Sequence, residues 1–184
     1  MTEGDSAPRW RFWANLLGNQ VVWLCAVAGA GQGLQWPALI SAGIYVASQL
    51  LMSPHPRKDL CLIVFAMACA FGVDGVAAAG GSVLYAAAPW GWIPPPWILA
   101  LWASFAMTLT ASMAFLQRHW LLPVAFGLLL APVAYVSAAR GFAVVQFSAP
   151  AWHGLLMLGA TWAAALSLLC RVARQAQFRP IASG

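Results

Sequence analysis

The chain has 184 residues, of which 62% are hydrophobic and only 7% are charged. Soluble domains hold about 25% charged residues, so this composition excludes an ordinary soluble core. The net charge is +5, but the basic residues lie in short clusters beside apolar segments and form no patch with interleaved aromatics. Nucleic acid is therefore not an expected partner, and we predict one compact all-α integral membrane domain.

Six apolar segments follow one another along the chain, and each is interpreted as a transmembrane helix, because roughly 20 apolar residues cross a bilayer core of about 30 Å. A polar tail over 1–11 precedes them and a basic tail over 171–184 follows them. The expected helices cover about 12–33, 36–52, 60–80, 96–117, 120–139 and 150–170. The first segment could instead be a cleavable signal peptide, but three amides interrupt its apolar run: Asn15, Asn19 and Gln20.

Proline and aromatic residues mark the connections. Residues 82–95 form an uncharged connector rich in Pro and aromatics, which we expect to lie at headgroup level in the outer membrane interface. A re-entrant segment is the alternative there. Pro132 falls inside the fifth expected helix and should kink it.

The distribution of basic residues predicts the orientation. In a six-helix alternation, only Arg140 falls on one side, and eight basic residues fall on the other: Arg9, Arg11, Arg57, Lys58, Arg118, Arg171, Arg174 and Arg179. Cytoplasmic loops carry the excess of Lys and Arg. Both termini are therefore expected in the cytoplasm.

Asp74 is the acidic residue within an apolar segment, where a carboxylate costs roughly 2.5 to 3.5 kcal/mol. At about 1.5 Å of rise per residue, Asp74 and Tyr135 fall at similar depth in the outer half of the bilayer. Arg140 and His153 lie at the same side and could reach toward them. The cluster is interpreted either as an outward-opening ligand or proton site, or as a structural ion pair.

Two further polar sets occur in the expected helices. Asn15 and Asn19 share a helix face, and Gln49 lies at comparable depth in the second helix. These amides either join helices by hydrogen bonds or contact a polar headgroup. Ser104, Thr108 and Ser112 form a stripe at four-residue spacing, which either lines a path or allows close helix packing.

Catalytic and metal-binding motifs are not evident. The four cysteines lie in or beside apolar segments without a C-x-x-C pair, so they are interpreted as packing residues, and neither a metal nor a cofactor is expected. The sequence has no H-E-x-x-H, G-x-S-x-G or phosphate-binding Gly-Lys loop. A catalytic role is the second choice.

Four stretches in order carry a family resemblance: 15–30 (NLLGNQVVWLCAVAGA), Asp74-Gly75, 95–116 (PPWILALWASFAMTLTASMAFL) and 131–147 (APVAYVSAARGFAVVQF). Together they resemble the small bacterial inner-membrane proteins catalogued as domain of unknown function 2878, over roughly residues 12–170. At Ala131 the chain departs from the Gly expected before Pro132. The resemblance implies a multi-pass protein of the bacterial inner membrane and no particular activity.

The resulting functional hypothesis is a protein that binds or transports an apolar or amphipathic small molecule or a lipid. The alternatives are a membrane-embedded lipid-modifying enzyme that uses Asp74, and a membrane scaffold for partner proteins. Membrane lipids are the expected partners, and assembly into a homo-oligomer stays open.

Overall fold

The computed structural model describes residues 9–91 and 93–178, with side chains described as far as Gln175. Its helical elements in order are α1 (Arg9–Gly31), α2 (Trp36–Met52), α3 (Pro56–Ala70), the π-helical turn η1 (Phe71–Gly75), α4 (Val76–Ala79), α5 (Pro96–Leu109), the 3-10 turn η2 (Ala114–Gln117), α6 (Leu121–Phe142) and α7 (Ala151–Phe178). Two strands, β1 (Val83–Tyr85) and β2 (Val145–Phe147), complete it. Most of the expected N-terminal tail and the end of the basic tail lie outside the described residues.

Four helical segments in the described part are long and apolar enough to cross a membrane. They are Arg9–Gly31, Pro56–Ala79, Leu121–Phe142 and Ala151–Gln175, whereas α2 and α5 are shorter apolar helices. The second segment joins α3, η1 and α4 into one continuous run. The all-α prediction and the apolar, membrane-type character of the helices are confirmed at this level.

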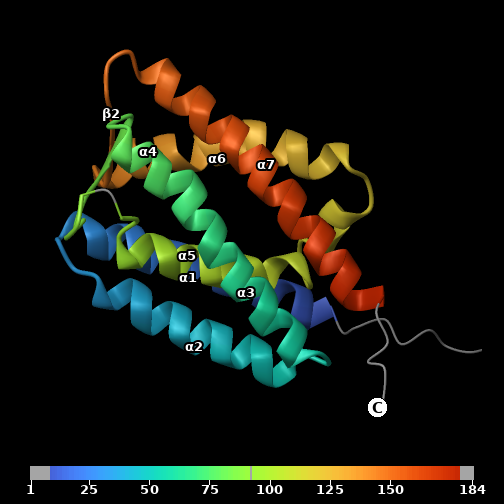
Figure 1. The fold of residues 1–184 in the computed structure, drawn as a ribbon. Coiled ribbons are helices and arrows are strands. Elements are labelled where there is room, and N and C mark those ends of the chain that lie inside the picture. Colours follow the sequence, from blue (N-terminus) through green and yellow to red (C-terminus); the bar gives the residue numbers. More distant parts are fainter. Residues whose placement is uncertain (1–8, 92, 179–184) are drawn as a thin grey trace, which may run out of the picture.

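The helices run alternately up and down the bundle (Figure 1). We call one end the basic end: it holds the start of α1, the α2–α3 and α5–α6 connections and the C-terminal part of α7. The other is the strand end, where β1 and β2 lie with the α1–α2 connection. Helices α6 and α7 form an antiparallel pair on one side of the bundle.

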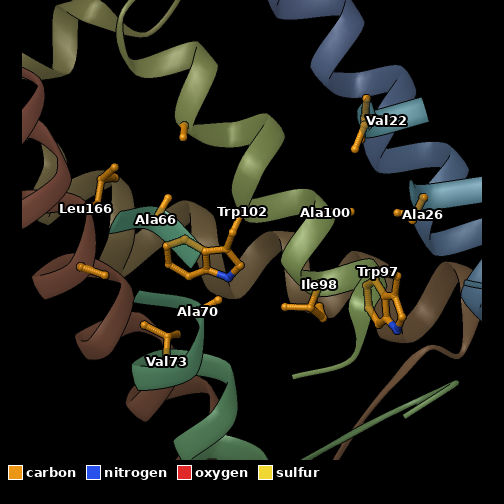
Figure 2. Close-up of a cluster of buried hydrophobic side chains, with 14 of the residues drawn as sticks. Val22, Ala26, Ala66, Ala70, Val73, Trp97, Ile98, Ala100, Trp102 and Leu166 are labelled. Atoms are coloured by element: carbon orange, nitrogen blue, oxygen red, sulfur yellow. The ribbon is translucent and has the colours of Figure 1, made fainter. Parts of the chain in front are cut away.

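Helix α5 is the central helix, packed against α1, α2, α3 and α7. Nine of its fourteen residues are buried, which is typical of a helix that is hydrophobic on all sides. Figure 2 shows Trp102 of α5 extending toward Ala66 and Ala70 of α3 and toward Leu166 of α7. The opposite face of α5 meets α1.

Helix α5 ends at Leu109, eight residues before the expected end of the fourth helix at 117. Side chains from elsewhere replace the helical hydrogen bonds at this end. The Ser112 amide donates to Asn15 Oδ1 at 3.2 Å, and the Gln117 side chain donates to the Leu109 carbonyl at 2.7 Å. Because these groups are satisfied by protein, irregular backbone is tolerated inside an apolar bundle.

Three other helices are longer than expected: α1 begins at Arg9, α6 continues to Phe142 and α7 to Phe178. Helix α6 continues past Pro132. It packs tightly against α7 at Gly127, where an added Cβ would lie 2.4 Å from the Ala163 backbone nitrogen. This pair of helices therefore depends on a residue without a side chain.

The connector at 82–95 is partly built into the fold. β1 pairs antiparallel with β2, with Val83 opposite Phe147 and Tyr85 opposite Val145. Val83 and Tyr85 are buried, while Trp90 is exposed. Trp90 fits the expectation of an interfacial loop, and Val83 and Tyr85 do not. Alternate residues of a strand face opposite sides, so these two side chains share the buried face of β1. Trp92 lies outside the described residues.

Candidate functional site

Asp74 is completely buried in η1, the π-helical turn near the strand end of the bundle. Three side chains from three different elements donate hydrogen bonds to its carboxylate. The Tyr85 hydroxyl donates to Oδ1 at 2.8 Å, the Trp102 indole N–H donates to Oδ2 at 2.7 Å, and the Tyr135 hydroxyl also donates to Oδ1. π-helical turns inside helices occur frequently at functional sites.

A second layer of aromatic contacts supports these donors. The Trp162 indole N–H of α7 donates to the Tyr135 hydroxyl at 3.2 Å. Trp102 and Trp162 stack with ring centroids 4.1 Å apart and an interplanar angle of 18°. The carboxylate network therefore joins η1, β1, α5, α6 and α7.

The strand pair positions Tyr85, whose backbone lies opposite Val145. Burial raises the pKa of the Tyr85 hydroxyl far above its ordinary value, because the ionised form loses its hydration. The hydroxyl therefore remains protonated and available as a donor.

Two predicted members of the Asp74 cluster lie elsewhere. Arg140 is exposed at the end of α6 and is not among the partners of Asp74, so the proposed Asp74–Arg140 pair is not formed in the described part of the chain. His153 is also exposed, and its ring lies 3.7 Å from that of Trp152. Tyr135 is the predicted member that the structure brings to Asp74. Arg140 remains outside, and three neutral donors take the place that it was expected to fill beside the carboxylate.

A cavity of about 360 Å³ adjoins this network and lies between α1, α5, α6 and α7. Tyr135, Trp102 and Trp162 contribute to its wall, and most of the remaining lining is apolar or aromatic. Its volume lies within the usual range of ligand pockets, about 300 to 1,000 Å³. Asp74 itself is not part of the wall, because Tyr135 and Trp102 stand between its carboxylate and the cavity.

The cavity has exposed residues on both flanks. Gln20 of α1 and three residues of α6, Leu130, Ala134 and Ser137, are exposed and also line it. Gln20 and Leu130 lie near the middle of their helices. The opening is therefore lateral, between α1 and α6, and not at either end of the bundle.

Asn15 forms a separate polar junction nearer the basic end. Its side chain donates to Gln49 Oε1 at 2.8 Å and to the Met107 carbonyl at 3.1 Å, and it accepts from the Ser112 hydroxyl at 2.5 Å. The Tyr45 hydroxyl donates to the Asn15 carbonyl at 3.0 Å. These bonds join α1, α2 and α5, which supports the interpretation as a helix-joining amide.

Asn19 is half-buried and lies in the cavity wall, apart from the Asn15 junction. The two amides that the sequence places on one helix face therefore have different surroundings in the structure.

Ser104 and Thr108 are fully buried, and their hydroxyls donate to carbonyls three residues earlier, at Leu101 and Phe105. This pattern favours packing over a polar path.

A second cavity, of about 480 Å³, lies at the basic end and has more charged side chains. Arg11, His55, Lys58 and Asp59 are part of its wall. Asp59 is buried and accepts a hydrogen bond from the Ser53 hydroxyl. In the described part of the chain no three His, Cys, Asp or Glu residues are grouped as metal ligands.

A family model described as a protein of unknown function (DUF2878) matches residues 12–168. The chain belongs to this family. No curated protein and no solved structure shows a significant match. The match includes every residue of the Asp74 network and the entire cavity wall, so both features of this DUF2878 member lie within the family region.

Sequence reasoning missed three members of the Asp74 network in this DUF2878 chain: Tyr85, Trp102 and Trp162. Tyr85 was expected at the membrane surface, and the two tryptophans have no motif around them. The small number of tyrosines was a signal in the sequence that could have pointed to Tyr85. The chain has three, and each donates a hydrogen bond inside the bundle, Tyr45 to Asn15 and the other two to Asp74.

Proposed function

We propose that this protein binds an apolar or amphipathic molecule, such as a lipid, in the cavity between α1, α5, α6 and α7. The observation that carries the proposal is the lateral opening of an aromatic-lined cavity near the middle of two apolar helices. A ligand that enters at this depth comes from the hydrocarbon region of the bilayer. It must therefore be soluble in lipid.

The Asp74 network favours binding over catalysis. Both carboxylate oxygens already accept hydrogen bonds, and three neutral donors occupy them. A general acid or base has to reach the proton that it transfers, whereas Asp74 is fully buried and separated from the cavity by Tyr135 and Trp102. The network instead holds Tyr135 and Trp102 in place, so that they form a rigid part of the cavity wall for a ligand.

The same proposal places the protein in the bacterial inner membrane with six crossings and both termini in the cytoplasm. The basic end of the bundle holds Arg9, Arg11, Arg57, Lys58, Arg118, Arg171 and Arg174, which supports this orientation by the positive-inside rule. Reporter fusions after Lys58, Arg118 and Arg174 should report cytoplasm. Fusions after Gln35 and Phe147 should report the outside, and an outside result at Arg118 would contradict six crossings.

Ligand binding is tested by occluding the opening. Ala134→Trp places an indole at the exposed edge of the cavity, and Ala125→Trp places the same group on an exposed part of α6 that is not in the wall. Purified proteins are washed in detergent, extracted with solvent and compared by mass spectrometry. We expect at least one lipid-soluble species to be retained by the parent and by Ala125→Trp and lost from Ala134→Trp.

Two results would contradict the proposal. One is that the parent retains no species beyond those of its detergent and bulk lipid. The other is that Ala134→Trp remains monodisperse and retains the same species in the same amount as Ala125→Trp.

A further inference from the structure

The cavity has an aromatic and uncharged surface. Four tryptophans, two phenylalanines and Tyr135 contribute to the wall, and the described residues that line it include no Lys, Arg, His, Asp or Glu. The faces of aromatic rings carry partial negative charge and attract cations within about 6 Å of the ring centre. The aromatic wall can therefore attract a cation. It has no positively charged side chain that could bind an anion.

The Asp74 carboxyl group lies behind this wall, and three donors are directed at its two oxygens. The indole N–H of Trp102 can only donate, so Oδ2 is an acceptor. Trp162 also donates to the Tyr135 oxygen, which leaves the Tyr135 proton to point toward Oδ1. Burial of a carboxyl group opposes its charged form, and donors directed at its oxygens favour that form, so the three hydrogen bonds offset part of the cost of a buried charge.

No cation within the described part of the chain neutralises this carboxylate. Its three partners, Tyr85, Trp102 and Tyr135, are neutral, and Arg140 is exposed. A charge inside an apolar bundle is weakly screened, so its field extends past the single layer of side chains that separates it from the cavity. That layer consists of Trp102 and Tyr135, which belong to the wall.

We infer that the cavity selects a lipophilic cation over a lipophilic anion of the same size and shape. The inference rests on the proposed function, since it assigns a ligand class to the same cavity. An amphipathic molecule with an organic ammonium group is the natural class, with its cation against the aromatic wall and its apolar part toward the opening between α1 and α6.

Tetraphenylphosphonium and tetraphenylborate are suitable probes because they have nearly equal size and opposite charge. Binding of each is measured by equilibrium dialysis against purified protein in nonionic detergent, with empty micelles as the blank. The quantity of interest is the ratio of cation affinity to anion affinity. Comparing this ratio between variants cancels the different partition of the two ions into micelles.

Asp74→Asn removes the charge and keeps the shape of the side chain. Asp59→Asn is the matched control, because it neutralises the other buried carboxylate of the same helical segment, about 22 Å away by helix rise. We expect Asp74→Asn to lower the cation-to-anion ratio at least about tenfold, the effect of 1.4 kcal/mol, and Asp59→Asn to leave it unchanged. An unchanged ratio in a folded Asp74→Asn protein would overturn the inference.

A measurement on the parent protein keeps the inference testable where Asp74→Asn does not fold. A neutral brominated alcohol quenches the cavity tryptophans, and each ion is titrated to displace it, with the same alcohol lacking bromine as the background. Displacement by the phosphonium at lower concentration supports the inference, and displacement by the borate at lower concentration overturns it. Absence of quenching in the parent argues against the proposed function itself, so the two failures are distinguishable.

Discussion

Trp102 of α5 and Trp162 of α7 stack face to face with centroids 4.1 Å apart, and both direct their indole N–H groups into one network. Trp102 donates to Asp74 directly, and Trp162 donates to the hydroxyl of Tyr135, which itself donates to Asp74. Two residues that are 60 positions apart thus support one carboxylate, one directly and one through Tyr135. The stack fixes the spacing of both donors.

The first prediction separates these two donors. Trp102→Phe leaves Oδ2 of a buried carboxylate without its donor, and a hydrogen bond to a charged group is worth about 1.5 to 3 kcal/mol. Trp162→Phe removes a neutral bond, worth about 0.5 to 1.5 kcal/mol, and leaves Tyr135 bound to Asp74. Thermal unfolding of the purified proteins should therefore rank Trp102→Phe as the more destabilised variant. The opposite ranking would place the main support of Asp74 elsewhere.

The second prediction concerns Arg140, which the sequence suggested as the partner of Asp74. Because Arg140 is exposed and the carboxylate is satisfied by neutral donors, Arg140→Gln should change stability by no more than about 0.5 kcal/mol. Combining it with Asp74→Asn should give additive effects. A rescue of Asp74→Asn by Arg140→Gln in thermal melts would show an ion pair that the structure does not contain.

The third prediction compares two amides of α1. Asn15→Ala leaves the Ser112 amide and the Gln49 side chain without partners in the bundle, and each buried polar group left unpaired costs about 1 to 3 kcal/mol. Asn19→Ala removes a half-buried side chain from the cavity wall, so it should affect ligand retention more than stability. Equal melting temperatures for the two variants would contradict the helix-joining role of Asn15.

The fourth prediction tests the contact between α6 and α7. Gly127→Ala adds a methyl group 2.4 Å from the Ala163 nitrogen, and the nearby atoms are backbone atoms that cannot rotate away. Overpacking of this kind costs about 1 to 3 kcal/mol or more. Gly43→Ala is the control, because an added Cβ in this exposed part of α2 meets nothing within 4 Å. Size-exclusion chromatography after heating should show early loss of monodisperse protein for Gly127→Ala alone.

Much of the helical framework could be predicted from apolar segment length, because a membrane-type helix satisfies its own backbone and needs no information from distant residues. The position at which α5 ends could not be predicted in this way. It depends on Asn15 and Gln117, which lie 94 residues before and eight residues after Leu109 and supply hydrogen bonds that only the folded chain brings together. A local pattern carries no signal of such partners.

In the candidate site, too, one part could be predicted from the sequence and another part could not. Asp74 was identifiable from composition alone, since a carboxylate in an apolar segment is costly and requires compensation. The nature of that compensation was not identifiable. Depth along the helices did not distinguish Tyr135 from Arg140 and His153 as a partner of Asp74. Only the side-chain geometry shows that Tyr135 is buried and that the other two are exposed. Tyr85 entered the site through strand pairing, which the connector sequence does not reveal.

On the proposed topology of six crossings, the shortness of α2 and α5 has a consequence for the surrounding lipid. At about 1.5 Å per residue, their 17 and 14 residues span roughly 26 and 21 Å, less than a hydrocarbon core of about 30 Å. Helix α2 also presents exposed Leu39, Ile40 and Ile44 outward. A membrane meets such a mismatch by thinning locally, so the bilayer should be thinner beside α2 than beside α6 or α7. Short-chain phospholipids would then gather along one flank of the protein and longer ones along the other.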